Sequence, residues 1–183
     1  MRSVVLIEPE IPENTGFVAR LCHNFDFNLR LVNPDFNLEA SRSTANNAQN
    51  ILREAKIFDS FEEAVEGLDF VVGTKPSKGI ECREFKFREN TSIVLGRESS
   101  GLTREELGKC DATVHIQASN YPSLNLSHAA SILMYQASDY RGKNVEGERL
   151  DLIEDRGGEV LRELIGRASP EKGELDKVIS ELV

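Results

Sequence analysis

The sequence predicts an α/β fold in which helices flank an open, mostly parallel sheet. Short apolar runs of strand length alternate along the chain with segments that have the period of an amphipathic helix. The apolar runs are residues 3–7, 29–32, 70–73, 93–95 and 113–116. Because continuous, often β-branched runs are typical of strands buried on both faces, the alternation predicts βαβ units and a ligand site at the carboxyl ends of the strands.

The helices between these strands are identified by apolar periodicity and by capping residues. The clearest apolar stripe, expected to face the core, is formed by Phe17, Val18, Leu21, Cys22 and Phe25. Further helices are predicted at residues 45–55, at 61–68, after the capping box at 103–106, and from about 126 to 140.

The composition changes after residue 145, and we expect two regions: an α/β domain at 1–145 and a short helical C-terminal extension at 146–183. The extension carries 11 acidic and 6 basic side chains. Its helical periodicity is interrupted at Gly157, Gly158 and Pro170, which predicts two or three short helices. We interpret them as a packing or dimer-forming appendage.

The composition is otherwise that of an ordinary globular protein. Of 183 residues, 39% are hydrophobic and 29% are charged, which excludes wholesale disorder. No apolar run approaches the ~20 residues that span a membrane, and residues 1–7 are interpreted as a first strand, not a signal peptide. The scattered cysteines Cys22, Cys82 and Cys110 form neither a disulfide framework nor a metal motif, which indicates a reducing, cytoplasmic location.

The net charge of −9 argues against broad electrostatic binding to nucleic acid. More than half of that charge lies in residues 146–183, however, which leaves room for a local basic surface on the rest of the chain. The residues expected to form it are Arg20, Arg30, Arg42, Lys75, Lys78, Arg97 and Arg104.

The loop after the first strand, residues 8–16, leads into a helix that carries Arg20. Unpaired amides at a helix N-terminus favour anionic ligands. Arg20 lies well away from the apolar stripe, so it points away from the core. An outward arginine is usually a surface residue, but one that lies early in the helix after the first strand is where α/β folds place their sites.

Several common chemistries are excluded by spacing. Gly96 and Gly101 have the spacing of a P-loop, but Leu102 and Thr103 stand where the lysine and serine or threonine belong. The chain also lacks the GxGxxG fingerprint of a dinucleotide site. The turn-forming loop at 73–79 alone indicates a plain surface turn as readily as a site.

The histidines and the adjacent Ser127 give no nucleophile or metal site. Ser127 and His128 are neighbours on a predicted helix and face different directions, without a nucleophile elbow around them. His23 and His115 are interpreted as surface or structural residues. No set of ligands has metal spacing, so we expect no metal.

Three motifs nevertheless occur together: Asn14-x-Gly16-x-x-x-Arg20, Leu95-Gly96-x-Glu98-x-x-Gly101-Leu102, and Ser123-Leu124-Asn125-Leu126-Ser127. In this order and spacing they resemble the signature motifs of the SpoU-type branch of the SPOUT RNA methyltransferases. Residues 31–34, 71–74 and 101–110 make the chain look most similar to the TrmJ-like tRNA ribose methyltransferases. The resemblance covers about residues 3–141 and omits the extension.

The resemblance implies a SPOUT fold with a C-terminal trefoil knot and an activity that depends on S-adenosyl-L-methionine. A methyl group would be transferred to a ribose 2′-hydroxyl of a cytidine or uridine in tRNA, in the anticodon loop near position 32 or 34. The family also implies a homodimer in which the partner chain completes each site.

The resemblance also implies site residues. Arg20 and Asn14 correspond to the catalytic motif. We expect Arg20 to orient the 2′-oxygen or to bind the adjacent phosphate, because a guanidinium with a pKa above about 12 is a poor base. Asn14 and Asn125 would hold Arg20 and the knot loop in register. The cofactor-binding positions would be Thr74, Lys75, Pro76, Gly96, Glu98, Ile116, Pro122, Ser123, Leu124 and Asn125.

The sequence departs from the family pattern at two places: Lys75-Pro76 replaces the small residues usual after the threonine, and His128 follows the third motif. Three alternative functions remain open at this point: an rRNA 2′-O-methyltransferase, a non-catalytic knotted RNA-binding paralogue, and an α/β enzyme acting on a small molecule. The last explains none of the motifs. The joint presence of Asn14, Arg20, Glu98 and Asn125 disfavours the paralogue.

Overall fold

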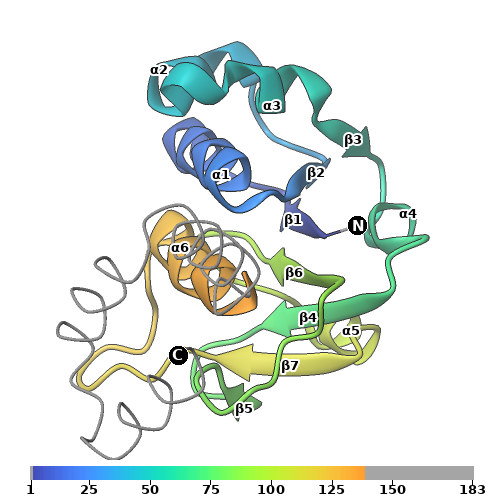
Figure 1. The fold of residues 1–183 in the computed structure, drawn as a ribbon, viewed down its shortest axis with the longest axis vertical. Helices are drawn as coiled ribbons and strands as arrows, with labels where there is room; N and C mark the ends of the chain where they lie inside the picture. Colours follow the sequence, from blue (N-terminus) through green and yellow to red (C-terminus); the bar gives the residue numbers. More distant parts are fainter. Residues whose placement is uncertain (1, 139–183) are drawn as a thin grey trace, which may run out of the picture. The chain divides into compact units, whose positions relative to one another are not determined.

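The computed structural model describes residues 2–138 (Figure 1). The chain divides into two units, Met1–Asp139 and Tyr140–Val183. The helical extension predicted at 146–183 therefore lies outside the described residues. No helix within the described part is long and apolar enough to cross a membrane.

Within residues 2–138, seven strands form one parallel sheet, which confirms the α/β, parallel-sheet part of the predicted fold class. The strands are β1 Ser3–Ile7, β2 Asn28–Val32, β3 Lys56–Phe58, β4 Phe70–Thr74, β5 Ile80–Glu81, β6 Thr91–Leu95 and β7 Ala112–His115. Their order across the sheet is β3-β2-β1-β6-β4-β7-β5. The central β6 is buried along its whole length, as expected for a parallel strand covered on both faces.

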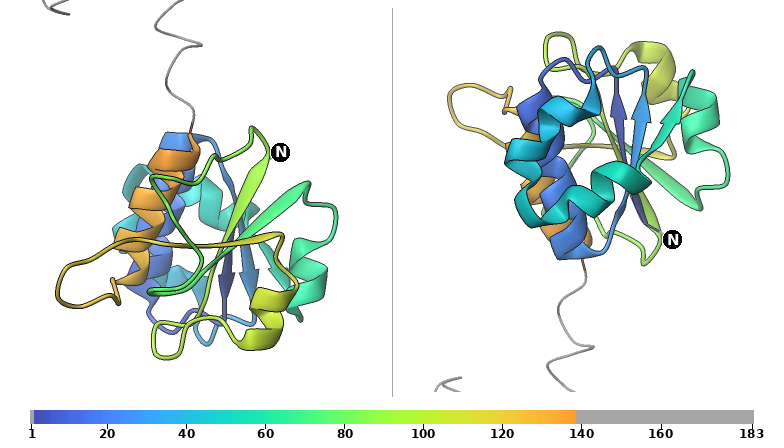
Figure 2. Two further views of the ribbon diagram at one scale, coloured as in Figure 1. Left: turned by 90° about the horizontal axis from the view of Figure 1, so that it is seen from below. Right: turned by 90° about the horizontal axis from the view of Figure 1, so that it is seen from above.

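Helices cover both faces of the sheet (Figure 2). One face carries α1 Pro12–Phe25, the 3-10 turns Leu38–Ser41 and Asn46–Ala48, α2 Arg42–Ala45, α3 Gln49–Glu54 and α6 Leu126–Ala137. The other carries α4 Phe61–Val65 and α5 Arg104–Gly108. The helices α1 and α6 lie side by side, so the first and last helices of the described chain share one layer.

The alternation of side chains along β1 divides the core into two clusters. Val4 lies in the larger cluster with Val18 of α1 and Leu133 of α6. Its neighbour Val5 lies in the smaller cluster with Phe61 of α4. Because side chains of a strand alternate between its faces, one buried strand supplies both layers.

The apolar stripe predicted for the first helix is only partly right. Val18 and Cys22 are buried, but Phe17 is 44% exposed. The buried face of α1 instead includes small and polar residues, because α2 approaches it closely. A Cβ on Gly16 would lie 2.0 Å from Thr44 Oγ1, so only glycine permits this approach.

The predicted helix at 45–55 is interrupted. The backbone at Asn46 has φ of +50°, and α2 ends there before α3 begins at Gln49. The edge strands β3 and β5 were not predicted, because they are short and lack a buried apolar run. The capping box at Thr103 is confirmed as the start of α5.

Candidate active site

A cleft of about 390 Å³ lies at the carboxyl ends of β4, β6 and β7. Its volume is within the range of about 300–1,000 Å³ that small-molecule sites occupy. The lining comes from the loops that follow these three strands and from the start of α6. All residues that the sequence resemblance assigned to the cofactor line this cleft: Thr74, Lys75, Pro76, Gly96, Glu98, Ile116, Pro122, Ser123, Leu124 and Asn125.

The loop after β6 folds back on itself and presents backbone to the cleft. The amide of Gly101 donates to the carbonyl oxygen of Arg97 at 2.8 Å, and Gly101 has φ of +69°. A Cβ on Gly96 would lie 2.2 Å from the carbonyl carbon of Gly101. Glycine at position 96 is therefore required for the tight fold of this loop.

A chain of hydrogen bonds joins the three sequence motifs. Asn14 Nδ2 on α1 donates to Glu98 Oε1 at 3.0 Å, and Asn125 Nδ2 donates to Asn14 Oδ1 at 3.0 Å. Asn125 caps α6, because its Oδ1 accepts from the amide of Ser127 at 2.9 Å. The second oxygen of Glu98 accepts from the amide of Glu10 at 2.8 Å.

The two ends of this chain fix the orientation of both amides. The Ser127 amide can only donate, so the oxygen of Asn125 must face it, and its NH₂ group then faces Asn14. The NH₂ group of Asn14 in turn faces Glu98, whose carboxylate can only accept. The donor and acceptor assignments of both amides are therefore consistent along the whole chain of hydrogen bonds.

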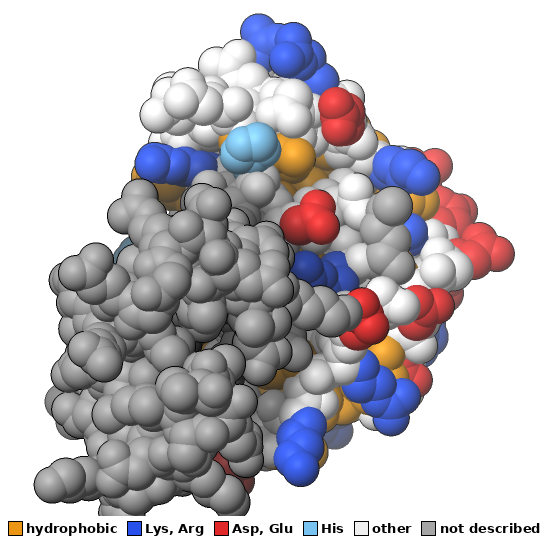
Figure 3. Space-filling model, viewed as in Figure 1, with side chains coloured by type: hydrophobic (Ala, Val, Ile, Leu, Met, Phe, Trp, Pro, Cys, Tyr) orange, Lys and Arg blue, Asp and Glu red, His pale blue; other side chains and the backbone are white. Residues whose placement is uncertain are grey.

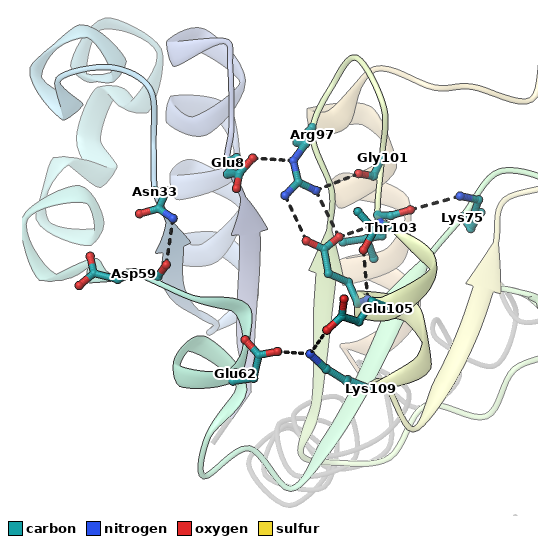
Figure 4. Close-up of polar contacts among 12 residues, drawn as sticks. Glu8, Asn33, Asp59, Glu62, Lys75, Arg97, Gly101, Thr103, Glu105 and Lys109 are labelled. Carbon is teal, nitrogen blue, oxygen red and sulfur yellow. Dashed lines mark hydrogen bonds and ion pairs between the residues drawn. The ribbon is translucent and has the colours of Figure 1, made fainter.

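A second network surrounds the neighbouring residue Arg97 (Figure 4). Arg97 Nε donates to Glu8 Oε2 at 2.6 Å, and its two Nη atoms donate to both oxygens of Glu106 at 3.1 and 3.2 Å. Glu106 also accepts from the amide of Thr103, in the capping box of α5. The network therefore ties the ends of β1 and β6 to α5.

The Arg97 network shifts the pKa values of its members. The hydrogen bonds that the guanidinium donates to Glu8 and Glu106 raise the pKa of Arg97. Burial alone would raise the pKa of Glu106, but the hydrogen bonds from Arg97 and Thr103 outweigh it and leave that pKa below its ordinary value. Arg97 is thus a structural cation whose charge is balanced by the carboxylates of Glu8 and Glu106.

Arg20 lies apart from both networks. It is exposed on α1, does not line the cleft, and has no ion pair or side-chain hydrogen bond with another residue of the described part. The side-chain hydrogen bonds of Asn14 run to Glu98 and Asn125. Its expected role in positioning Arg20 stays a prediction.

The predicted basic surface is only partly present. Arg97 is neutralised, Arg42 pairs with Glu39, and Arg30 donates to backbone carbonyls while it stacks on Phe58. On the face drawn in Figure 3, the basic and acidic side chains of the described residues are interspersed. The charge on this face is therefore mixed rather than a single basic field.

Glu8, Glu10 and Ser99 also belong to the site region, and the sequence reasoning missed them. Glu10 accepts from both the amide and the hydroxyl of Ser99, at 3.1 and 2.6 Å. The available signal was their position, because carboxylates directly after a first parallel strand lie at the edge where ligands bind.

Thiol and metal chemistry find no support among the described residues. Burial raises the pKa of Cys110 to about 11 and raises those of Cys22 and Cys82 as well, so these thiols are not nucleophiles near neutral pH. No group of His, Cys, Asp and Glu within residues 2–138 could hold a metal ion. The Nδ1 atom of His115, which lines the cleft, is buried without a hydrogen-bond partner in this part.

The fold and the cleft define an α/β protein with a cleft of small-molecule size at the carboxyl edge of a parallel sheet. Comparisons with known proteins narrow this class. The family model of the SpoU rRNA Methylase family matches residues 1–135. The chain is 34% identical over 185 residues to the tRNA (cytidine-2′-O-)-methyltransferase TrmJ of Methanocaldococcus jannaschii, covering 91% of this chain and 79% of that protein.

Solved structures agree. A structure described as giving insights into the 2-OH methylation of C/U34 on tRNA has a TM-score of 0.69 and 30% identity, over 75% of this chain and 93% of that one. The SpoU methyltransferase AviRb of Streptomyces viridochromogenes, solved in complex with AdoMet, shares the fold with a TM-score of 0.65 at 23% identity, over 76% and 57% of the two chains. The chain therefore belongs to the SpoU methylase family.

Proposed function

We propose that this chain transfers a methyl group from S-adenosylmethionine to the ribose 2′-hydroxyl of a cytidine or uridine in the anticodon loop of tRNA, at position 32 or 34. One observation carries the proposal. The hydrogen-bond chain through Asn14, Glu98 and Asn125 joins all three methyltransferase motifs beside the cleft. The names of the similar TrmJ protein and of the C/U34 structure support tRNA as the substrate.

The cleft fits S-adenosylmethionine in size and chemistry. Its wall at Gly96 and Gly101 is backbone, which suits hydrogen bonds to an adenine and a ribose. Apolar side chains of Ile116 and Leu124 line the same cleft and suit the face of a purine ring. When bound, the cofactor supplies an electrophilic methyl group on a sulfonium. The chain's own residues then need to align the acceptor oxygen and ease the loss of its proton.

Arg20 supplies that alignment in our proposal. Its guanidinium presents a planar set of donors that suits a ribose oxygen or a phosphate. Arg20 is exposed and free of partners in the described part, so it can contact RNA without breaking an ion pair. Asn14, in contrast, positions the loops at 98 and 125.

We also propose that the enzyme is a homodimer. Phe17 of α1 and Ile132 and Tyr135 of α6 are exposed apolar side chains on two adjacent helices, and Phe25 contacts Tyr135 edge to face. Such a surface suits a two-fold contact between copies of the chain. Because Arg20 does not line the cleft of its own chain, a partner's Arg20 would complete each site. A monomer in light scattering at micromolar concentration would contradict this.

The trefoil knot and a cytoplasmic location form part of the same proposal. The strands β4 and β5 lie on opposite edges of β7, so residues 75–79 connect one edge of that strand to the other. The amide of Lys75 donates to Val114 and that of Cys82 donates to His115, on the two edges of the strand. A connection from one edge of β7 to the other is compatible with a knot that involves residues 116–125. The role of tRNA as substrate and the reduced cysteines favour the cytoplasm.

The test is mass spectrometry of nuclease-digested tRNA after incubation with the protein and S-adenosylmethionine. We expect one 2′-O-methylated cytidine or uridine in the anticodon loop. Arg20→Ala should lose transfer by about 100-fold or more while it still binds the cofactor. Arg53→Ala, an exposed arginine of α3, is the control. Transfer by Arg20→Ala within a few-fold of wild type would contradict the role of Arg20.

A second candidate substrate is rRNA, because the description of the matching family model names rRNA methylases. The same assay with ribosomal RNA distinguishes the two. Methylation of rRNA in place of tRNA would keep the reaction and cofactor and replace the substrate.

A further inference from the structure

Lys75 is the residue directly after β4, and its side chain lines the cleft. Its amide donates to the carbonyl oxygen of Val114, which fixes the backbone at the end of β7. Its ammonium donates to the carbonyl oxygen of Leu102 at 3.2 Å (Figure 4). The side chain therefore reaches from the loop after β4 to the loop after β6. The family resemblance implies a small residue at this position, and this chain has a lysine there.

The charged side chains that line the cleft differ in how many hydrogen-bond and ion-pair partners they have. Arg97 is neutralised by Glu8 and Glu106, and both oxygens of Glu98 accept hydrogen bonds. Lys75, in contrast, has a single partner in the described part, which is a neutral carbonyl oxygen. An ammonium group carries three N–H donors, so two of them remain available.

Partial burial makes this ammonium a site for an anion. The Lys75 residue is partly buried, and a cation withdrawn from water is stabilised by an opposite charge within hydrogen-bonding distance. The bond to Leu102 limits the conformations of the side chain and holds the ammonium at the cleft. An anionic ligand group would thus meet a donor that is already positioned.

We propose that Lys75 binds the carboxylate of the amino-acid end of S-adenosylmethionine and so selects ligands that carry it. The inference rests on the proposed function, because it concerns the cofactor of that reaction. The carboxylate is the only anionic group of this cofactor, whose sulfonium and amino group are cationic and would be repelled by Lys75. Glu98, at the same cleft, offers the opposite charge for the cationic groups.

The test compares two ligands that differ only in the carboxylate with a third that lacks the whole amino-acid end. Isothermal titration calorimetry measures the binding of S-adenosylmethionine, of decarboxylated S-adenosylmethionine and of 5′-methylthioadenosine, which lacks the whole amino-acid end. We expect wild type to prefer S-adenosylmethionine over its decarboxylated form by about 10- to 100-fold, as one charge-assisted hydrogen bond provides.

In Lys75→Met that preference should fall to within about twofold, while the affinity for 5′-methylthioadenosine stays unchanged. Lys75→Arg should retain most of the preference, because it keeps the positive charge. Lys78→Met is the matched control: it removes an exposed lysine of the same loop that does not line the cleft, and it should bind all three ligands as wild type does.

The outcomes separate this inference from the proposed function. If wild type binds S-adenosylmethionine without preferring it to the decarboxylated form, the inference is overturned and the proposed function stands. The same holds if Lys75→Met loses affinity equally for all three ligands, or loses affinity for tRNA alone. Absence of binding to every adenosyl ligand would overturn both. The wild-type comparison decides the matter even if Lys75→Met does not fold.

Discussion

Arg97 and Glu98 are adjacent in the chain, yet they belong to networks of different chemistry. Arg97 is held by two carboxylates, and its side chain is 18% exposed. Glu98 meets one side-chain amide and one backbone amide, in a chain that continues through Asn14 to Asn125. One network consists of charges around a guanidinium, and the other consists of amides aligned from a single carboxylate.

The two networks hold different parts of the cleft: one holds its scaffold and the other holds the residues of the methyltransferase motifs. The Arg97 network joins β1, β6 and α5, which are elements of the scaffold. The Glu98 chain joins α1 to the loops at 98 and 125, which belong to the methyltransferase motifs. We therefore expect damage to the first to appear as lost stability, and damage to the second as lost activity.

The largest expected effect is on stability. Arg97→Met removes the cation between Glu8 and Glu106 and leaves the 12% exposed Glu106 carboxylate without its partner. The free energy of unfolding should fall by about 3 kcal/mol in urea denaturation, since a partly buried charge is left uncompensated. Arg104→Met, an exposed arginine in the same region, should change it by less than about 0.5 kcal/mol. Equal losses in both variants would contradict the comparison.

The same network predicts a dependence on pH. The pKa of Glu106 is lowered in the folded state, so its stabilisation is present above the ordinary glutamate pKa and is lost as the pH falls through the lowered value. Glu106→Gln should cost about 2 kcal/mol at pH 7. The difference from wild type should shrink below about pH 4.5, as the wild-type carboxyl becomes protonated. A difference that does not change between pH 7 and pH 3.5 would show that the charge has no role.

For the Glu98 network we expect the opposite result: a loss of activity with little loss of stability. A glutamine at position 98 offers one acceptor and one donor, so either Asn14 or the amide of Glu10 loses its acceptor. Methyl transfer by Glu98→Gln should fall about tenfold, with less than about 1 kcal/mol lost from the free energy of unfolding. Glu54→Gln on α3 is the exposed control. Normal transfer by Glu98→Gln would break the distinction between the networks.

The smallest expected effect is on stability and tests whether α5 belongs to the scaffold. Thr103→Ala removes the hydroxyl that accepts from the Glu106 amide at the start of α5, without changing any charge. It should lower the free energy of unfolding by about 1 kcal/mol, the usual cost of a lost helix cap. Transfer at a temperature where the variant is folded should match wild type. Reduced methyl transfer by the folded variant would show that α5 contributes to activity and not to stability alone.

The sequence predicted the parts of this molecule in which local pattern and global fold agree. The buried strands β1, β2, β4, β6 and β7 and the capping box of α5 follow from apolar runs and from local hydrogen bonding. The edge strand β3 was missed because its Ile57 is 56% exposed, so no buried run marks it. Phe17 was misplaced because the close approach of α2 moves the buried face of α1 toward Gly16.

The site followed a similar division. Motif resemblance predicted a set of positions that the structure brings to one cleft, because loops after neighbouring parallel strands meet at one edge. Resemblance did not predict that Arg97 would pair with Glu8 and Glu106, since Glu8 is 89 positions away in the chain and meets Arg97 only in the folded state.

The full burial of β6 has a consequence for motion. Its amides lie between β1 and β4 and can exchange with deuterium only when the whole domain unfolds. The loop that begins at Gly96 has the exposed residues Ser99 and Ser100, so we expect its amides to exchange faster than those of β6. A boundary between slow and fast exchange is then expected within a few residues of Leu95. The cleft thus rests on the slowest-exchanging part of the described domain.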